Sequence, residues 1–276
     1  MSGCQAQCGL VTPKATPKLV ATDLDGTLVR RDGSVSPYAR EVLAALEARG
    51  VPVIFVTGRP LRWTRPVFEH VGSLGLAIVS NGALVWDVAA STARESFALA
   101  GEASLEVVTR IREALPGSVF GAERLEGFAV ERGFPDGPGR EEAPRLELDE
   151  LTATPMLKLL SLHPDYEPDE YWKRAEEAVG DLATVTHSST FALLEISAYG
   201  VTKASTLAEV ATSLGVAAKD VIAFGDMPND IAMLTWAGRS FAMADAHPEV
   251  RACASDVAPS HEEDGVARVL AEVFDL

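Results

Sequence analysis

Two aspartates stand close together in the segment KLVATDLDGTLV, which spans residues 18–29. The apolar run before Asp23 and the Asp25, Gly26 and Thr27 that follow it indicate a buried strand leaving its sheet. Carboxylates this close repel each other strongly unless a cation lies between them. Hard carboxylate oxygens that face a phosphate usually hold Mg²⁺, so the segment predicts a Mg²⁺ site. A solvated turn is the ordinary alternative, because Asp and Gly are common turn residues.

Other polar residues follow apolar runs further along the chain: Thr57 after VPVIFV, Asn81 after LAIVS, and Asp226 and Asp230 after VIAFG. Ligands of open α/β sheets bind beyond the carboxyl ends of the strands, so these residues are expected to meet Asp23 at one sheet edge. Each residue alone is weak support, because Asp and Asn are common where strands end. The prediction rests on their convergence.

Lys203 stands in the first turn of a predicted helix, where the positive end of the helix dipole disfavours a cation. Only a nearby negative charge, such as Asp23 or a bound phosphate, would compensate for the unfavourable interaction between its ammonium group and the helix dipole. The alternative is an ordinary surface lysine.

The order of the elements explains how these residues could meet. Strands and helices alternate up to about residue 83, and the alternation returns after Gly200, which predicts a parallel sheet with right-handed crossovers. The region between carries short strands and two amphipathic helices, typical of an inserted α/β domain. We therefore expect a loose tail at 1–17, a core domain formed by 18–83 and 199–276, and an inserted domain at 84–198.

Composition excludes several classes of protein. With 47% hydrophobic residues in 276, the chain is not disordered, and its net charge of −16 argues against nucleic acid or anionic membrane as a partner. Cys4, Cys8 and Cys253 are too few for a disulfide framework, which predicts a reducing, cytoplasmic location. We also expect no signal peptide and no membrane span.

Several motifs resemble those of one family. The stretches DLDGT at Asp23, TGR at Thr57, Lys203 before a helix, and GDMPND ending at Asp230 are similar to the four motifs of the haloacid dehalogenase superfamily of phosphatases. SNGA at Ser80 and the closing stretch resemble the Cof-type branch. The resemblance implies a Rossmann-like core with an inserted type IIB α/β cap. GDMPND departs from the more usual GDGxND, which puts the shape of that loop in doubt.

The resemblance also implies catalytic roles. Asp23 would be the nucleophile that forms an aspartyl-phosphate, and Asp25 the general acid and base. Mg²⁺ would be held by Asp23, the Asp25 backbone carbonyl, Asp226 and Asp230. The residues expected to bind the phosphoryl group are Gly26, Thr27, Thr57, Gly58, Lys203 and Asn229. The candidates for contacting the rest of the substrate are Asn81, Arg124, His187, Ser188 and Glu195. The alternative for Asn81 is a turn residue before Gly82, and the alternative for the other four is an ordinary cap surface.

The expected activity is Mg²⁺-dependent hydrolysis of small phosphorylated metabolites such as sugar phosphates, by a monomer or homodimer. A phosphotransferase or mutase with the same aspartate nucleophile is the alternative among enzymes. A signalling receiver that merely holds a phosphoryl group is a third possibility, although receivers lack a large inserted domain and the second aspartate of DxD. The sequence has no P-loop, GxGxxG or GxSxG motif, so nucleotide-cradling and serine-hydrolase functions lack support.

Overall fold

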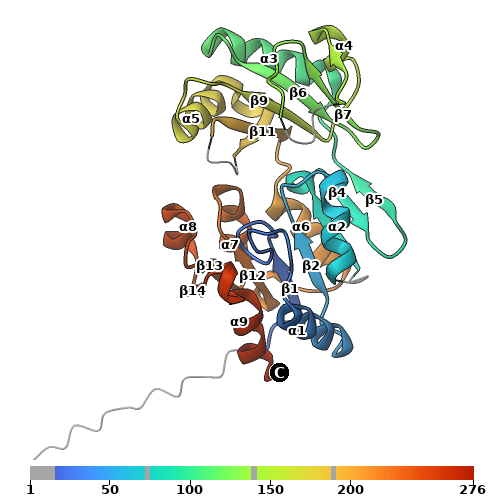
Figure 1. Ribbon diagram of the computed structural model, residues 1–276, viewed down its shortest axis with the longest axis vertical. Helices are drawn as coiled ribbons and strands as arrows, with labels where there is room; N and C mark the ends of the chain where they lie inside the picture. Colours follow the sequence, from blue (N-terminus) through green and yellow to red (C-terminus); the bar gives the residue numbers. More distant parts are fainter. Residues whose placement is uncertain (1–15, 72–74, 138–141, 188–190) are drawn as a thin grey trace, which may run out of the picture.

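The protein is described by a computed structural model that covers residues 16–71, 75–137, 142–187 and 191–276, so Cys4, Cys8 and Ser188 lie outside the described residues. Figure 1 shows two lobes, one above the other. Each lobe has its own sheet and its own cluster of buried apolar side chains. We call residues 16–96 and 203–276 the core lobe and residues 101–198 the cap lobe.

Within the described residues, the core lobe contains an eight-stranded sheet in the order β14-β13-β12-β1-β2-β3-β4-β5. The strands β14 to β3 run parallel, whereas β4 and β5 run antiparallel to their neighbours. The strands are β1 (Leu19–Thr22), β2 (Val53–Val56), β3 (Leu76–Val79), β4 (Leu84–Asp87), β5 (Thr92–Ser96), β12 (Val221–Gly225), β13 (Arg239–Met243) and β14 (Asp256–Ala258).

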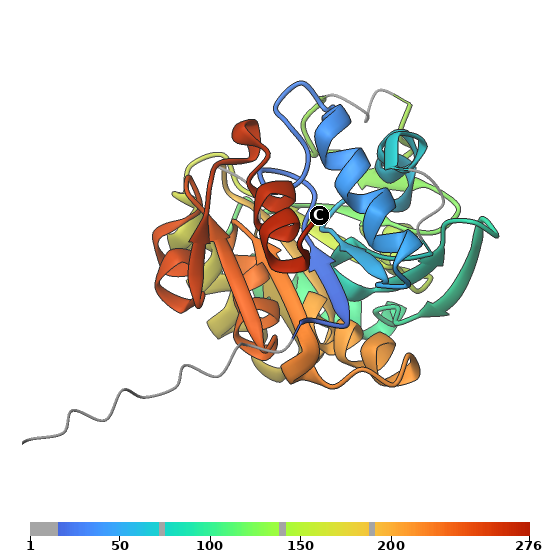
Figure 2. The same ribbon diagram turned by 90° about the horizontal axis from the view of Figure 1, so that it is seen from below.

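Helices cover both faces of this sheet, so its central strands are buried along their whole length. In Figure 2, α1 and α9 lie on one face and α6 on the other. The helices of the core lobe are α1 (Pro37–Ala48), α2 (Leu61–Val71), α6 (Lys203–Ser213), α7 (Ile231–Trp236), α8 (Pro248–Cys253) and α9 (Gly265–Phe274). Helix α1 begins with Ser36, which accepts a hydrogen bond from the Ala39 N–H, and with Pro37 in the first turn.

The first domain boundary differs from the predicted one. Strand β4 follows β3 after a short turn and pairs with it antiparallel, and β5 pairs with β4, so the core sheet continues to Ser96 rather than ending near residue 83. An antiparallel return needs only a tight turn, whereas a parallel strand needs a long crossover. Every residue of β5 is exposed, so its sequence carries no apolar pattern that would have revealed it.

The cap lobe carries, among its described residues, a six-stranded sheet in the order β10-β11-β9-β6-β7-β8. Helices α3 and α5 pack against each other, and both contribute to the buried apolar cluster of this lobe, which includes Ile111, Phe120 and Tyr171. Its elements are α3 (Gly101–Ala114), β6 (Val119–Glu123), β7 (Phe128–Glu131), β8 (Arg145–Leu146), α4 (Leu148–Thr152), β9 (Lys158–Leu162), α5 (Pro168–Val179), β10 (Ala183–Thr186) and β11 (Leu193–Ala198). Across the described residues, no helix combines the length and the apolar character needed to cross a membrane.

Candidate functional site

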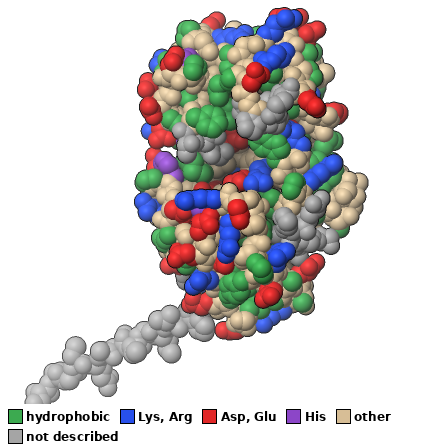
Figure 3. Space-filling model, in the orientation of Figure 1, with side chains coloured by type: hydrophobic (Ala, Val, Ile, Leu, Met, Phe, Trp, Pro, Cys, Tyr) green, Lys and Arg blue, Asp and Glu red, His purple; other side chains and the backbone are tan. Residues whose placement is uncertain are grey.

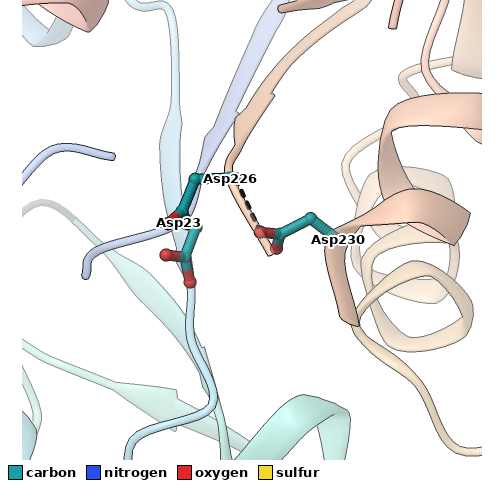
Figure 4. Close-up of side chains that lie close together, drawn as sticks. All are labelled: Asp23, Asp226 and Asp230. Atoms are coloured by element: carbon teal, nitrogen blue, oxygen red, sulfur yellow. Dashed lines mark hydrogen bonds between the residues drawn. The ribbon is translucent and has the colours of Figure 1, made fainter. Parts of the chain in front are cut away.

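Adjacent parallel strands place the predicted carboxylates at one sheet edge. Strand β1 pairs with β12 so that Thr22 lies opposite Phe224, and Asp23 and Asp226 follow directly after the two strands end. Asp230 closes a short 3-10 turn, Pro228–Asp230, that leads into α7. Figure 4 shows the three side chains gathered there. One carboxylate oxygen from each lies within 4.8 Å of the others, so the structure brings these predicted residues together.

Lys203 is inserted into this acidic cluster. Its Nζ lies 2.6 Å from Asp23 Oδ1 and 2.7 Å from Asp230 Oδ1, and its side chain is only 1% exposed. Thr202 accepts a hydrogen bond from the Ser205 N–H and so starts α6 where Lys203 faces the carboxylates. Burial alone would lower the pKa of Lys203, but Asp23 and Asp230 outweigh burial and raise it. The lysine is therefore held as a cation.

One lysine does not balance the acids around it. Burial raises the pKa of Asp23 well above its ordinary range; Lys203 lowers it, and the charges of Asp230 and Asp226 raise it further. Burial, with Asp230 nearby, raises the pKa of Asp226 to about 7. Burial is the largest cause of both shifts and the neighbouring carboxylates add to it, so a bound cation would relieve the repulsion among these groups.

The donor set fits Mg²⁺, which binds hard oxygen ligands. Asp230 has both oxygens engaged, because Oδ1 accepts from Lys203 and Oδ2 accepts from the Asp226 and Met227 N–H groups at 3.0 and 3.1 Å. Asp23 and Asp226 are thus the better candidates for direct ligands, with Asp230 in support. The Asp226 side chain can pack against residue 26 only because that residue is a glycine. A Cβ on Gly26 would lie 2.3 Å from Asp226 Oδ2, and the φ of Gly26 is +71°.

Asp25 lies at the mouth of the site, with its side chain 58% exposed. Arg59 donates from Nε to Asp25 Oδ2 at 2.7 Å and from Nη2 to Asp25 Oδ1 at 2.5 Å. These bonds raise the pKa of Arg59. We did not select Arg59 from the sequence, although its position in TGR, directly after a predicted strand end, was the signal available.

Two of the predicted phosphate-binding residues are buried beneath the loops. Thr27, 1% exposed, donates its hydroxyl to Asp226 Oδ1 at 3.2 Å and so contacts a carboxylate rather than the cleft. Thr57, also 1% exposed, accepts the Arg59 N–H on Oγ1 at 3.0 Å. Gly26, Gly58, Lys203 and Asn229 all line the cleft described next.

A cleft of about 740 Å³ opens between the lobes above Asp23, and Figure 3 shows the surface hollowed there. Its lining includes Leu193 and Glu195 from β11 of the cap lobe. Asn81 joins the lobes beside it, donating to Glu195 Oε2 at 2.9 Å while its Oδ1 accepts from Asn229 at 3.0 Å. Lys158, a cap-lobe residue that sequence reasoning missed, donates to Glu195 Oε1 at 2.6 Å and to the Gly58 carbonyl at 2.5 Å.

The other cap-lobe candidates are placed differently from the prediction. Arg124 donates to the Leu151 carbonyl within the cap lobe. His187 is 2% exposed, packs against the Trp172 ring and lies 3.4 Å from Asp169. Neither side chain lines the cleft, because each points into the packing of its own lobe. Asn81 and Glu195 are the predicted substrate residues that lie beside it.

Comparisons with known proteins agree with this geometry. A family model described as haloacid dehalogenase-like hydrolase matches residues 20–270. The chain is 29% identical over 269 residues to the 5-amino-6-(5-phospho-D-ribitylamino)uracil phosphatase of Bacillus subtilis, a match that covers 92% of this chain and 94% of the relative. It is also 29% identical over 239 residues to the HMP-PP phosphatase of Yersinia pestis, covering 85% of this chain and 86% of the relative.

Solved structures show the same fold. A haloalkanoate superfamily phosphatase from Bacteroides thetaiotaomicron has a TM-score of 0.80 at 21% identity, covering 98% of this chain and 100% of its own. A subclass IIB sugar phosphatase has a TM-score of 0.78 at 20% identity, covering 94% of this chain and 100% of its own. The two-lobed architecture with an inserted cap is thus the one predicted. Because the family model spans nearly the whole chain, this protein belongs to the haloacid dehalogenase-like hydrolases.

Proposed function

We propose that the protein is a Mg²⁺-dependent phosphatase that hydrolyses small phosphorylated metabolites through an aspartyl-phosphate on Asp23. The observation that carries the proposal is the position of Asp23 in the cleft, held by Lys203 and surrounded by Asp226 and Asp230. A buried carboxylate oriented by a lysine is suited to in-line attack on phosphorus. Family membership leaves no support for a signalling receiver.

Two displacements make up the reaction. In the first, an Asp23 oxygen forms a bond to phosphorus, the ester P–O bond breaks, and Asp25 gives its proton to the departing alkoxide. In the second, Asp25 takes a proton from a water molecule that attacks the aspartyl-phosphate, which releases inorganic phosphate and restores Asp23. Asp25 lies at the mouth of the cleft, where Arg59 donates to both of its carboxylate oxygens, so one of these two hydrogen bonds would open when Asp25 carries the proton.

The phosphoryl group would be bound by the loops beneath the cleft. The Thr57 hydroxyl, which accepts the Arg59 N–H and keeps its own proton, would donate to a phosphoryl oxygen that reached beneath the loop in which Thr57 is buried. Backbone N–H groups near Gly26 and Gly58 and the Lys203 ammonium would oppose the remaining charge. Mg²⁺, held by Asp23, Asp226 and the Asp25 carbonyl with Asp230 in support, would neutralise phosphoryl oxygens when bound.

The names of the relatives narrow the class of substrate that we propose. Two curated relatives are named for phosphorylated compounds, a ribitylaminouracil phosphate and HMP-PP, and a structural neighbour is called a sugar phosphatase. We take a small phosphate ester as the substrate, with sugar phosphates as one candidate class. A cytoplasmic location and a monomeric or dimeric state also stay predictions.

Phosphate release from an aryl phosphate, measured with MgCl₂ and with EDTA, tests the proposal. Asp23→Asn should abolish turnover, whereas Asp149→Asn, which changes an exposed aspartate of α4, should leave it intact. The proposal fails if the wild type shows no Mg²⁺-dependent hydrolysis or if Asp23→Asn keeps full activity. Inorganic phosphate as product separates a phosphatase from the alternative phosphotransferase or mutase, which retains the phosphoryl group on an organic hydroxyl.

A further inference from the structure

The outer part of the cleft has apolar groups on two opposing sides. Pro60, Trp63 and Pro66 come from the core lobe, from α2 and the residue before it, and Leu193 comes from the cap lobe. Trp63 is 42% exposed, which is unusual for so large an apolar side chain. An exposed aromatic ring that lines a ligand cleft is a natural contact surface for part of that ligand.

The charged groups of the same region already have protein partners. Arg62 donates from Nε to Glu123 Oε1 and from Nη2 to Glu123 Oε2, each at 3.0 Å. The Arg62 guanidinium also lies 4.2 Å from the Trp63 ring centroid and 4.9 Å from that of Phe128. The contacts with Glu123 and Phe128 join α2 to the cap lobe, so the Arg62 side chain helps to hold the two lobes together.

Lys158, the second charged group in this region, also has its hydrogen-bond partners within the protein. Lys158 is 2% exposed and donates to Glu195 and to the Gly58 carbonyl, and Glu195 accepts a further hydrogen bond from Asn81. A smaller hollow of about 50 Å³ adjoins the cleft here, and Phe128, Leu160 and Leu193 contribute apolar lining to it. The polar side chains in this part of the cleft therefore form most of their hydrogen bonds with other groups of the protein.

We propose that the cleft selects phosphate esters whose leaving group carries a flat, largely apolar ring, held between Trp63 and Leu193, over esters of polyhydroxylated sugars. This inference rests on the proposed phosphatase function. A sugar would give up water at several hydroxyls and find the nearby polar groups engaged, which costs free energy for each unpaired hydroxyl. A flat ring loses little hydration and buries its faces against the indole.

Three esters isolate the shape and polarity of the leaving group. Benzyl phosphate, cyclohexylmethyl phosphate and glucose 6-phosphate each join a six-membered ring to phosphate through a CH₂–O bond. Their rings are flat and apolar, puckered and apolar, and puckered and hydroxylated. We expect kcat/KM in the presence of Mg²⁺ to be highest for benzyl phosphate, about tenfold or more above glucose 6-phosphate, with the cyclohexyl ester between them.

Trp63 variants test the proposed contact. Trp63→Ala should lower kcat/KM for benzyl phosphate by about tenfold while changing that for glucose 6-phosphate by less than about twofold, and Trp63→Phe should keep the preference. Trp63→Ala also removes the ring that Arg62 stacks on within α2. Any effect of that change on the Arg62–Glu123 contact would act on every ester, so the ratio of the two kcat/KM values is the readout. Tyr38→Ala, which removes a 40% exposed aromatic of α1 outside the cleft, is the matched control.

Two results would overturn the inference: a kcat/KM for glucose 6-phosphate equal to or above that for benzyl phosphate, or an equal loss on all three esters in Trp63→Ala. Failure of the proposed function looks different. In that case none of the three esters is hydrolysed in a Mg²⁺-dependent manner by the wild type.

Discussion

Replacing Lys203 with methionine should destabilise the core lobe strongly. Methionine is unbranched and similar in length but carries no charge. The Lys203 Nζ lies 2.6 and 2.7 Å from Asp23 and Asp230, and both carboxylates are almost fully buried. Removing one partner of a buried ion pair leaves uncompensated charge and costs about 3–5 kcal/mol. We expect a loss of that size in the free energy of unfolding at pH 7.5 in EDTA.

Urea unfolding followed by tryptophan fluorescence measures the loss, with the transition of the core lobe fitted separately because two lobes need not unfold together. Lys173→Met, which removes an exposed lysine of α5, is the control and should change the unfolding free energy by less than about 0.5 kcal/mol. Activity of Lys203→Met should also fall by about 10²–10³-fold, because the phosphoryl charge loses a fixed cation.

The double variant Lys203→Met/Asp230→Asn gives a second check. Removing the Asp230 carboxylate together with the Lys203 ammonium leaves one fewer unpaired charge. The loss of unfolding free energy in the double variant should therefore be smaller than the sum of the two single losses. A loss below about 1 kcal/mol in Lys203→Met, or strict additivity in the double variant, would refute the view that Lys203 balances buried carboxylates.

Two further predictions concern the metal site. The folded-state pKa of Asp226, about 7, lies above its ordinary value of 3.8, so its contribution to stability is complete below about pH 4 and is lost as the pH rises through 7. The Tm in EDTA should therefore fall from pH 5 to pH 8 and Mg²⁺ should reduce that fall, whereas a rising Tm in EDTA would contradict the assignment. Gly26→Ala should weaken Mg²⁺ binding in calorimetric titration, because its Cβ would meet Asp226 Oδ2 at 2.3 Å. Gly33→Ala, with a similar φ of +82° and no heavy atom within 4 Å, is the control, and equal Mg²⁺ affinities in the two variants would remove the clash as the cause.

The convergence of the acidic residues could be predicted because it depends on local signals and one topological rule. Asp23 and Asp226 each follow a short, fully buried strand, and parallel neighbouring strands end at the same edge of a sheet. The position of Lys203 followed from the helix start at Thr202, which the sequence marks clearly.

The cap lobe was harder to predict because side-chain direction there depends on strand register and packing. Glu195 lies opposite Leu160 on β9 and reaches the cleft, whereas Arg124, just past the end of β6, turns back to the Leu151 carbonyl. Nothing local in the sequence separates these two outcomes. The same holds for Lys158, whose role depends on its closeness to Gly58, 100 residues away in the chain.

The bonds from Lys158 to the Gly58 carbonyl and from Asn81 to Glu195 bear on protein engineering. In a chimera that carries a foreign cap on this core, Gly58 and Asn81 would lose these hydrogen-bond partners unless the new cap had a lysine and a glutamate at the positions of Lys158 and Glu195. A foreign cap could therefore replace this one directly only if it carried both of those side chains. A graft without them would need a redesigned junction before its specificity could be compared.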